Sequence, residues 1–122
     1  MVLAFIVGTA GALGAVARYL VDGLVQVRTK GVFPYGTLVV NVGGSLLMGL
    51  VTGIVLFHGT ASTLAAVAGA GFCGGFTTWS AFSWESVRLF EERQHRAALL
   101  NAAGGLAASL AAAAIGLSLA AL

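Results

Sequence analysis

Four long apolar runs, separated by short charged segments, constrain this chain more than any other feature of its sequence. The runs cover about residues 3–21, 37–57, 64–84 and 97–122. Each is close to the roughly 20 residues that a helix needs to cross the hydrocarbon core of a bilayer. Because four such spans use nearly all of the 122 residues, we expect one all-α transmembrane domain over residues 1–122, in a cell membrane.

The composition excludes a soluble protein. Hydrophobic residues make up 59% of the chain and charged residues 8%, whereas a soluble domain has about 25% charged residues. The formal charge of +2 is too small to form a nucleic-acid surface. The single Cys73 excludes an intrachain disulfide framework.

Small residues favour close contact between the helices. The segments Gly49–Gly53 and Gly71–Gly75 each have glycines four residues apart. Lipid provides no hydrophobic force for helix pairing, so small residues let backbones approach and gain dispersion contacts. Close packing alone accounts for most of these glycines.

Polar residues inside the runs form two stripes at helical spacing. One stripe contains Thr37, Asn41 and Ser45, and the other contains Asn101, Gly105 and Ser109. Neither contains a carboxylate or a lysine, although a proton- or cation-coupled carrier usually has an ionisable residue within the membrane. Neutral amides and hydroxyls can replace the hydration shell of an anion. They can equally serve to bond neighbouring helices, so the stripes alone leave both interpretations open.

The third run contains an unusual segment, GAGFCGGFTTWSAFSWE, at residues 69–85. Its glycines permit a helix to unwind, and its paired threonines can bond the freed backbone groups. Non-helical backbone at membrane depth is tolerated only where it is buried in protein or lines a wet cavity, and its free carbonyls can bind a small cation. Trp79 and Phe82 follow on one helical face, where positive ring edges can favour an anion. We therefore predict a broken third helix.

Three motifs resemble the CrcB/Fluc family of fluoride channels: GALGAVARY at residues 11–19, GTLVVNVGGSLLMG at 36–49 and GFCGGFTTWSAFS at 71–83. The resemblance implies a passive, fluoride-selective channel, not an enzyme, that exports cytoplasmic fluoride. It further implies an antiparallel dimer of four-helix subunits, formed with itself or with a homologous chain. A structural sodium ion at the dimer centre would be bound by the backbone carbonyls of Gly74 and Thr77.

The same resemblance assigns the pore-lining residues. The pore asparagine falls on Asn41 and the two pore phenylalanines fall on Trp79 and Phe82, so that tryptophan replaces one phenylalanine. Asn101 stands where many members have tyrosine. Hydroxyl groups along the same path are expected from Ser45, Thr78, Ser80 and Ser109.

Two charged residues flank this path. Arg18 matches an arginine that ends the first helix of the family, where it either concentrates anions at the pore mouth or snorkels to the interface. Glu85 is expected to close the third helix and to face water.

Two other functions fit a small four-helix membrane protein. A proton-coupled antiporter of the multidrug-resistance kind needs a glutamate embedded in its first helix, and residues 1–21 contain no acidic residue. A non-conducting subunit that assembles with other membrane proteins would explain the glycines but not a broken third helix.

Charge placement predicts the orientation in the membrane. With four spans, the first and third connections lie on one side, and these connections together with the end of the first run contain all six Lys and Arg residues. By the positive-inside rule the two termini then face outward. An antiparallel dimer would need a partner chain of opposite bias, or one chain that inserts in both directions.

Overall fold

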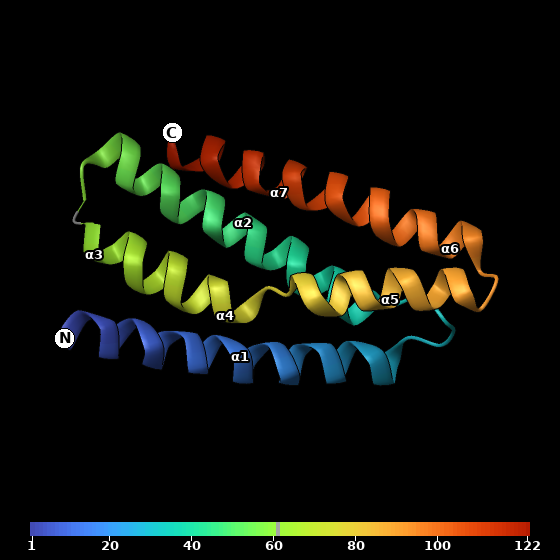
Figure 1. The fold of residues 1–122 in the computed structure, drawn as a ribbon. Coiled ribbons are helices and arrows are strands. Elements are labelled where there is room, and N and C mark those ends of the chain that lie inside the picture. Colours follow the sequence, from blue (N-terminus) through green and yellow to red (C-terminus); the bar gives the residue numbers. More distant parts are fainter. Residues whose placement is uncertain (61) are drawn as a thin grey trace.

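The computed structural model describes residues 1–60 and 62–122, and this part of the chain is helical, with no strand. Helices α1 (Val2–Arg28) and α2 (Tyr35–His58) come first (Figure 1). The next run consists of α3 (Ser62–Leu64), a π-helical segment (Ala65–Cys73) and α4 (Gly74–Phe76), and α5 (Trp79–Glu91) follows it. The chain ends with α6 (His95–Leu99), a second π-helical segment (Leu100–Gly104) and α7 (Gly105–Ala120).

Within the described residues, three helical stretches are long and apolar enough to cross a membrane: Val2–Arg28, Tyr35–His58 and His95–Ala120. The third apolar run differs from these. Thr77 and Thr78 both have extended backbone, with φ −78° and ψ 160° at Thr77 and φ −145° and ψ 121° at Thr78. These two residues separate α4 from α5, so that each part of the run is shorter than a membrane span.

Helix α1 continues to Arg28, seven residues beyond the expected end of the first span. Its 27 residues correspond to about 40 Å at 1.5 Å per residue, whereas the hydrocarbon core is about 30 Å thick. Polar residues do not stop a helix that has left the hydrocarbon, so the end of the apolar run is not the end of the helix. Arg18 therefore lies well inside α1, and the expectation that it ends the helix is wrong.

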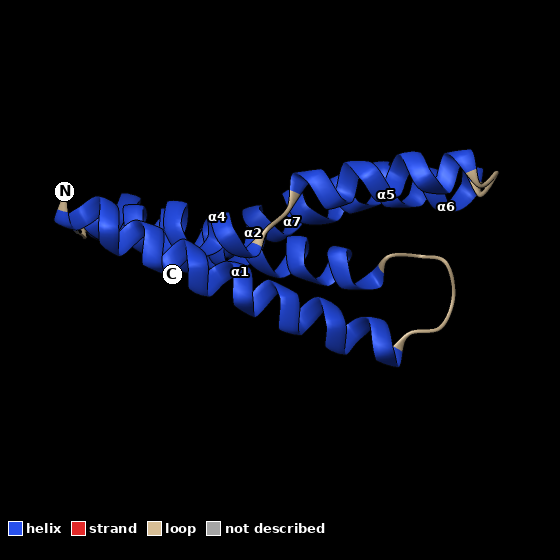
Figure 2. Cartoon of the chain, turned by 60° about the horizontal axis from the view of Figure 1, so that its bottom comes forward, coloured by secondary structure: helices blue, strands red, loops and turns tan. Residues whose placement is uncertain are grey.

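The helices pack in two groups that share α2. Helix α7 runs beside α2 along most of its length, while α1 packs against α2, α4 and the π-helical segment Ala65–Cys73 (Figure 1). Helix α5 contacts mainly α6 and the π-helical segment that follows it. Figure 2 shows α5 and α6 diverging from the ends of α1 and α2 beyond the interruption.

Close approach of α2 and α7 depends on glycine. A Cβ atom added at Gly49 would meet the carbonyl of Ala113, and one added at Gly116 would meet the carbonyl of Leu46. This confirms that the glycine pattern starting at Gly49 serves tight packing. Gly104 behaves differently, since a Cβ atom there would meet nothing within 4 Å.

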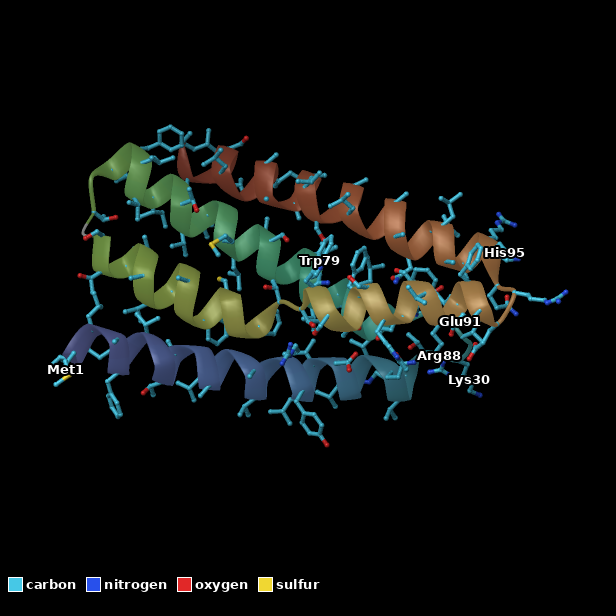
Figure 3. All side chains as sticks on the ribbon, in the orientation of Figure 1. Met1, Lys30, Trp79, Arg88, Glu91 and His95 are labelled. Carbon is cyan, nitrogen blue, oxygen red and sulfur yellow. The ribbon has the colours of Figure 1, made fainter. Side chains whose placement is uncertain are left out.

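The two ends of the bundle differ in charge. Met1 lies at one end, and Lys30, Arg88, Glu91 and His95 lie at the other (Figure 3). The connection after α1 and the turn between α5 and α6 contain Lys30 and Arg93. Three further basic residues lie in the helix ends that flank these two connections: Arg28, Arg88 and Arg96.

Candidate functional site: an uncharged cavity at the helix interruption

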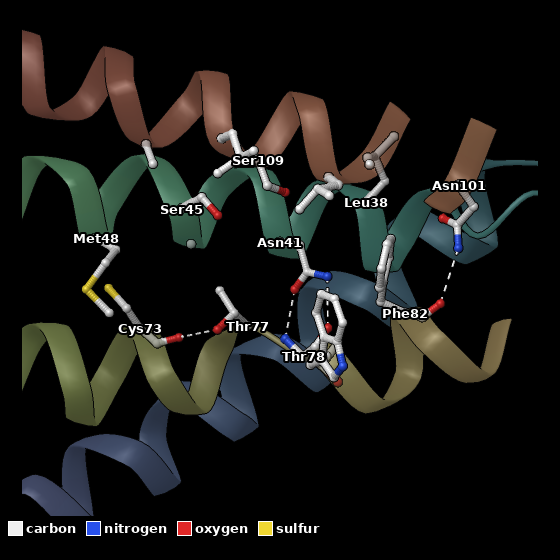
Figure 4. A pocket seen from close by; sticks show the side chains of 16 residues that line it. Leu38, Asn41, Ser45, Met48, Cys73, Thr77, Thr78, Phe82, Asn101 and Ser109 are labelled. Atoms are coloured by element: carbon white, nitrogen blue, oxygen red, sulfur yellow. Dashed lines mark hydrogen bonds between the residues drawn. The ribbon is translucent and has the colours of Figure 1, made fainter. Parts of the chain in front are cut away.

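A cavity of about 350 Å³ lies beside the interruption, between α2, the third run and the last helix (Figure 4). None of its lining residues carries a charge. Its polar groups are amides, hydroxyls and an indole, and the remaining wall is apolar. The lining residues used below are Leu38, Asn41, Ser45, Cys73, Thr77, Thr78, Trp79, Phe82, Asn101, Gly105 and Ser109.

The side chain of Asn41 binds both backbone groups of Thr78. Its Nδ2 donates to the Thr78 carbonyl at 2.9 Å, and the Thr78 N–H donates to Oδ1 of Asn41 at 2.7 Å. A primary amide has the same donor and acceptor groups as a peptide unit. Asn41 therefore replaces the backbone partners that extended Thr78 has lost, and α2 stabilises the interruption.

The bond to Asn41 also frees a carbonyl. In a continuous α-helix the N–H of residue 78 would donate to the carbonyl of Gly74, four residues earlier. Here that N–H is engaged by Asn41. The preceding residue still follows the helical pattern, because the N–H of Thr77 donates to the Cys73 carbonyl at 2.9 Å. The helical hydrogen-bond pattern is thus lost first at Gly74.

The two threonine hydroxyls complete the ends of the neighbouring helices. Oγ1 of Thr77 donates to the Cys73 carbonyl at 2.9 Å. Oγ1 of Thr78 accepts the N–H of Ala81 at 3.2 Å and so caps the N-terminus of α5. Paired threonines therefore satisfy backbone groups at the interruption, as their place in the sequence suggested.

Two aromatic rings follow the interruption. The ring centroids of Trp79 and Phe82 are 5.4 Å apart and the rings are tilted by 41°. Phe82 packs against Gly105, where an added Cβ atom would lie 3.1 Å from its ring. Trp79 is different, because 71% of its surface is exposed in the single chain. Within the single chain, little of this large aromatic side chain is therefore packed against other residues.

Asn101 is almost completely buried at the far end of the cavity, with an exposed fraction of 1%. Its Nδ2 donates to Oγ of Ser86 at 2.9 Å and lies 3.4 Å from the carbonyl of Phe82. Its Oδ1 has no hydrogen-bond partner among the residues that the structure describes. A buried acceptor without a partner costs about 1–3 kcal/mol.

The structure brings together most, but not all, of the residues expected along a pore. Asn41, Ser45, Thr78, Trp79, Phe82 and Ser109 all line the cavity, together with Thr77. Three other expected residues lie outside it. Ser80 is exposed, with its hydroxyl 3.4 Å from that of Thr78, Gly74 is exposed in the single chain, and Arg18 is half-buried in α1.

The expectation that Glu85 closes the third helix and faces water is wrong. It lies inside α5, which continues to Glu91, and it is half-buried instead of facing water. Its Oε1 accepts the hydroxyl of Thr37 at 2.8 Å, and its Oε2 is buried without a partner in the described chain. Thr37 precedes Asn41 by one turn of α2 and Glu85 follows Thr78 by two turns of α5, so the antiparallel helices that meet at Asn41 meet again here. Thr37 belongs to the polar stripe of the second run, so this stripe was the sequence feature that pointed to the contact with Glu85.

Comparisons with known proteins show the family of this chain. A family model described as "CrcB-like protein, Camphor Resistance (CrcB)" matches residues 5–117. The chain belongs to the CrcB-like family. It is 49% identical over 91% of its length to "Fluoride-specific ion channel FluC 1" of Leifsonia xyli subsp. xyli, of which 81% is covered. It is 46% identical over 93% of its length to "Fluoride-specific ion channel FluC 1" of Symbiobacterium thermophilum, of which 94% is covered.

An archaeal relative extends the similarity. "Fluoride-specific ion channel FluC 2" of Haloarcula marismortui is 47% identical over 88% of this chain, with 84% of that relative covered. Membership of the CrcB-like family and the three apolar helices make this chain a multi-pass protein of the cell membrane. The family resemblance inferred from the three motifs is confirmed.

The Asn41 bonds to Thr78 predict the effect of removing the amide. Asn41→Leu leaves the N–H and the C=O of Thr78 without partners, which costs about 1–3 kcal/mol for each group. We expect a lower unfolding temperature in detergent and faster hydrogen exchange at the Thr78 amide.

The matched control is Ser45→Ala, one turn further along α2. Ser45 lines the same cavity, but its hydroxyl makes no hydrogen bond to the part of the chain that the structure describes. Equal stability of the two variants would contradict the role given to Asn41.

Proposed function

We propose that this chain forms a passive, fluoride-selective channel that exports cytoplasmic fluoride. The observation that carries this proposal is the cavity at the interruption, lined by neutral donors and without a charged residue. The names of the three relatives as fluoride-specific ion channels give independent support.

Neutral donors suit conduction of a small anion. A fixed positive charge would bind the anion too tightly to release it, whereas amide and hydroxyl groups can replace its water and let it leave. The membrane potential contributes about 2.3 kcal/mol per charge for each 100 mV. With a negative interior this drives an anion outward, so export needs no coupled ion.

The proposal includes an antiparallel dimer. Trp79 is 71% exposed beside the cavity, and apolar side chains on α1 such as Leu13 and Leu24 are 61% and 57% exposed. Lipid can cover the apolar residues, but an indole next to a polar cavity is better covered by protein. A second subunit against Trp79 would close the open side of each cavity and give two equivalent paths.

The proposal also includes a structural sodium ion, held by the backbone carbonyls of Gly74 and Thr77. Among the described residues no group of three or more His, Cys, Asp or Glu side chains could hold a metal ion, so the ligands would have to be neutral oxygens. Two observations fit. The Gly74 carbonyl has lost the N–H of Thr78 to Asn41, and Gly74 is exposed where a partner would pack. Carbonyls of interrupted helices are suitable ligands for sodium, and here they would fix the subunits together.

Fluoride selectivity is the direct test of the proposed function. Purified protein in liposomes loaded with potassium fluoride should release fluoride when valinomycin carries the potassium, and a fluoride electrode measures the rate. The same vesicles loaded with potassium chloride should retain their chloride. Equal release of both anions, or release that requires a proton gradient, would contradict a passive fluoride channel.

A variant pair locates this activity in the cavity. Phe82→Ile removes a ring that lines the cavity and should slow fluoride release. Phe90→Ile makes the same change on an exposed residue outside the cavity and should leave the rate unchanged.

The sodium proposal predicts that fluoride efflux depends on the backbone at Gly74 and Thr77 and not on the Thr77 side chain. Because carbonyls would bind the ion, Thr77→Ala should keep most of the fluoride efflux, while Gly74→Val should impair assembly or conduction. Prolonged dialysis against a large organic cation should also lower the efflux of the unaltered protein, and sodium should restore it. Indifference of efflux to both the cation and Gly74→Val would exclude the site.

The charge distribution predicts a single orientation. Lys30 and Arg88 lie at the end opposite Met1 (Figure 3). Arg28, Arg93 and Arg96 are close to them in the sequence, so the positive-inside rule puts the termini outside. Reporters fused to the C-terminus, one active only outside the cell and one only inside, measure the orientation. An outside signal alone supports pairing with a homologous chain of opposite orientation, whereas equal signals would show dual insertion and a homodimer.

A further inference from the structure

Helices α2 and α7 end side by side. They run in the same direction, and both end toward the left of Figure 1, at His58 and Ala120. Nε2 of His58 lies 2.8 Å from the carbonyl oxygen of Ala120. A carbonyl oxygen only accepts, so Nε2 carries the hydrogen and donates it. Among the described residues this is the one side-chain hydrogen bond between the two helices.

This hydrogen bond uses a carbonyl that α7 itself leaves free. The last carbonyls of an α-helix have no N–H partner within the helix. At the end of α7 the N–H groups of Ala121 and Leu122 donate to the carbonyls of Ser118 and Leu119. The imidazole of His58 donates to the next carbonyl, that of Ala120. A side chain at the end of one helix therefore caps the end of its neighbour.

No charged side chain competes for this imidazole. Residues 31–84 and 97–122 contain no Asp, Glu, Lys or Arg, so α2, α7 and the segment that follows α2 offer it only neutral acceptors. His58 is exposed, and without the carbonyl of Ala120 its N–H would be left to water. The position of α7 thus decides whether the donor of His58 has a protein partner.

The remaining contact between α2 and α7 is close and apolar. Added Cβ atoms at Gly49, Gly53 and Gly116 would each collide with the opposite helix. Van der Waals contact of this kind sets the distance between two helices but has little directional preference, whereas a hydrogen bond tolerates a change of only a few tenths of an ångström. A shift of α7 along α2 by one residue, about 1.5 Å, would break the hydrogen bond from His58.

The register of these helices matters because both line the cavity. Asn41 comes from α2 and Ser109 comes from α7. The other end of the last helix is already fixed, since Nδ2 of Asn101 donates to a serine hydroxyl of α5 at 2.9 Å. The hydrogen bond from His58 holds the opposite end, so the lining positions of α7 lie between two fixed points.

We propose that His58 is a positioning residue of the anion path. Its hydrogen bond to Ala120 holds α7 in register with α2 and so keeps the two walls of the cavity at the spacing that admits fluoride and excludes chloride. This inference rests on the proposed function. It gives a role in selectivity to a side chain that does not line the cavity.

Three substitutions at position 58 test the geometry of this hydrogen bond. His58→Leu removes the donor. The amide nitrogen of glutamine reaches about as far from the backbone as Nε2 of histidine, whereas that of asparagine is one bond shorter. His58→Gln should therefore keep the ratio of fluoride to chloride efflux from liposomes. His58→Leu and His58→Asn should lower this ratio by about threefold or more, as expected for loss of one neutral hydrogen bond.

The efflux ratio separates positioning from stability, because an inactive fraction of the protein lowers the release of both anions equally. His95→Leu is the matched control. His95 is exposed, and its ring packs against Phe90 at the opposite end of the bundle with centroids 4.7 Å apart, so this variant should keep the wild-type ratio. A wild-type ratio in His58→Leu, or an equal loss in His58→Gln and His58→Leu, would overturn the inference.

Hydrogen exchange separates this inference from the proposed function, because it does not depend on transport. Mass spectrometry of a peptide that covers residues 114–122 should show faster exchange in His58→Leu and His58→Asn than in the wild-type protein, and wild-type exchange in His58→Gln. Unchanged exchange in His58→Leu would overturn the role of His58 even in a protein that transports fluoride. Absence of fluoride efflux from the wild-type protein would overturn the channel proposal, and the exchange rates would still decide whether His58 holds α7 against α2.

Discussion

The reciprocal hydrogen bonds between the Asn41 side chain and the backbone of Thr78 are the interaction on which the rest of this structure depends. A chain in lipid has to satisfy every backbone group from within the protein, and two extended residues between helical segments would otherwise leave groups unpaired. Asn41 supplies both partners of Thr78, at 2.9 Å and 2.7 Å. The interruption, the cavity beside it and the free carbonyl of Gly74 all follow from this contact.

Small residues and neutral polar residues have separate tasks around this contact. Gly49 and Gly116 let α2 and α7 touch backbone to backbone, which fixes the face of α2 that carries Asn41. The cavity then forms where the packing opens, and its wall contains donors such as the hydroxyl of Ser109 but no charge. Charged groups gather at the end where α5 and α6 meet. This separation is what a passive anion path requires, because a fixed charge within it would trap or exclude the ion.

Much of this was predictable from the sequence, and the failures have physical causes. Helical spacing placed Asn41 and Ser45 on one face because α2 is regular, and the motif around Thr77 and Thr78 identified the family. The end of α1 and the surroundings of Glu85 were not predicted, since apolar runs mark where a helix meets lipid and not where it ends. The hydrogen bonds of Asn101 could not be predicted from the sequence either. They depend on how α5 packs against the start of the last helix, and no local pattern encodes that packing.

The fluoride efflux rate of Asn41→Asp in liposomes, relative to the unaltered protein, tests the central claim most directly. Aspartate can still accept the N–H of Thr78, so the interruption should persist and the protein should still assemble. It cannot donate to the Thr78 carbonyl, and its charge faces the cavity, where a unit charge about 4 Å from the anion repels it by about 4 kcal/mol. We predict that efflux falls by at least about tenfold in an assembled protein. Efflux at the unaltered rate would contradict the assignment of this cavity to the anion path.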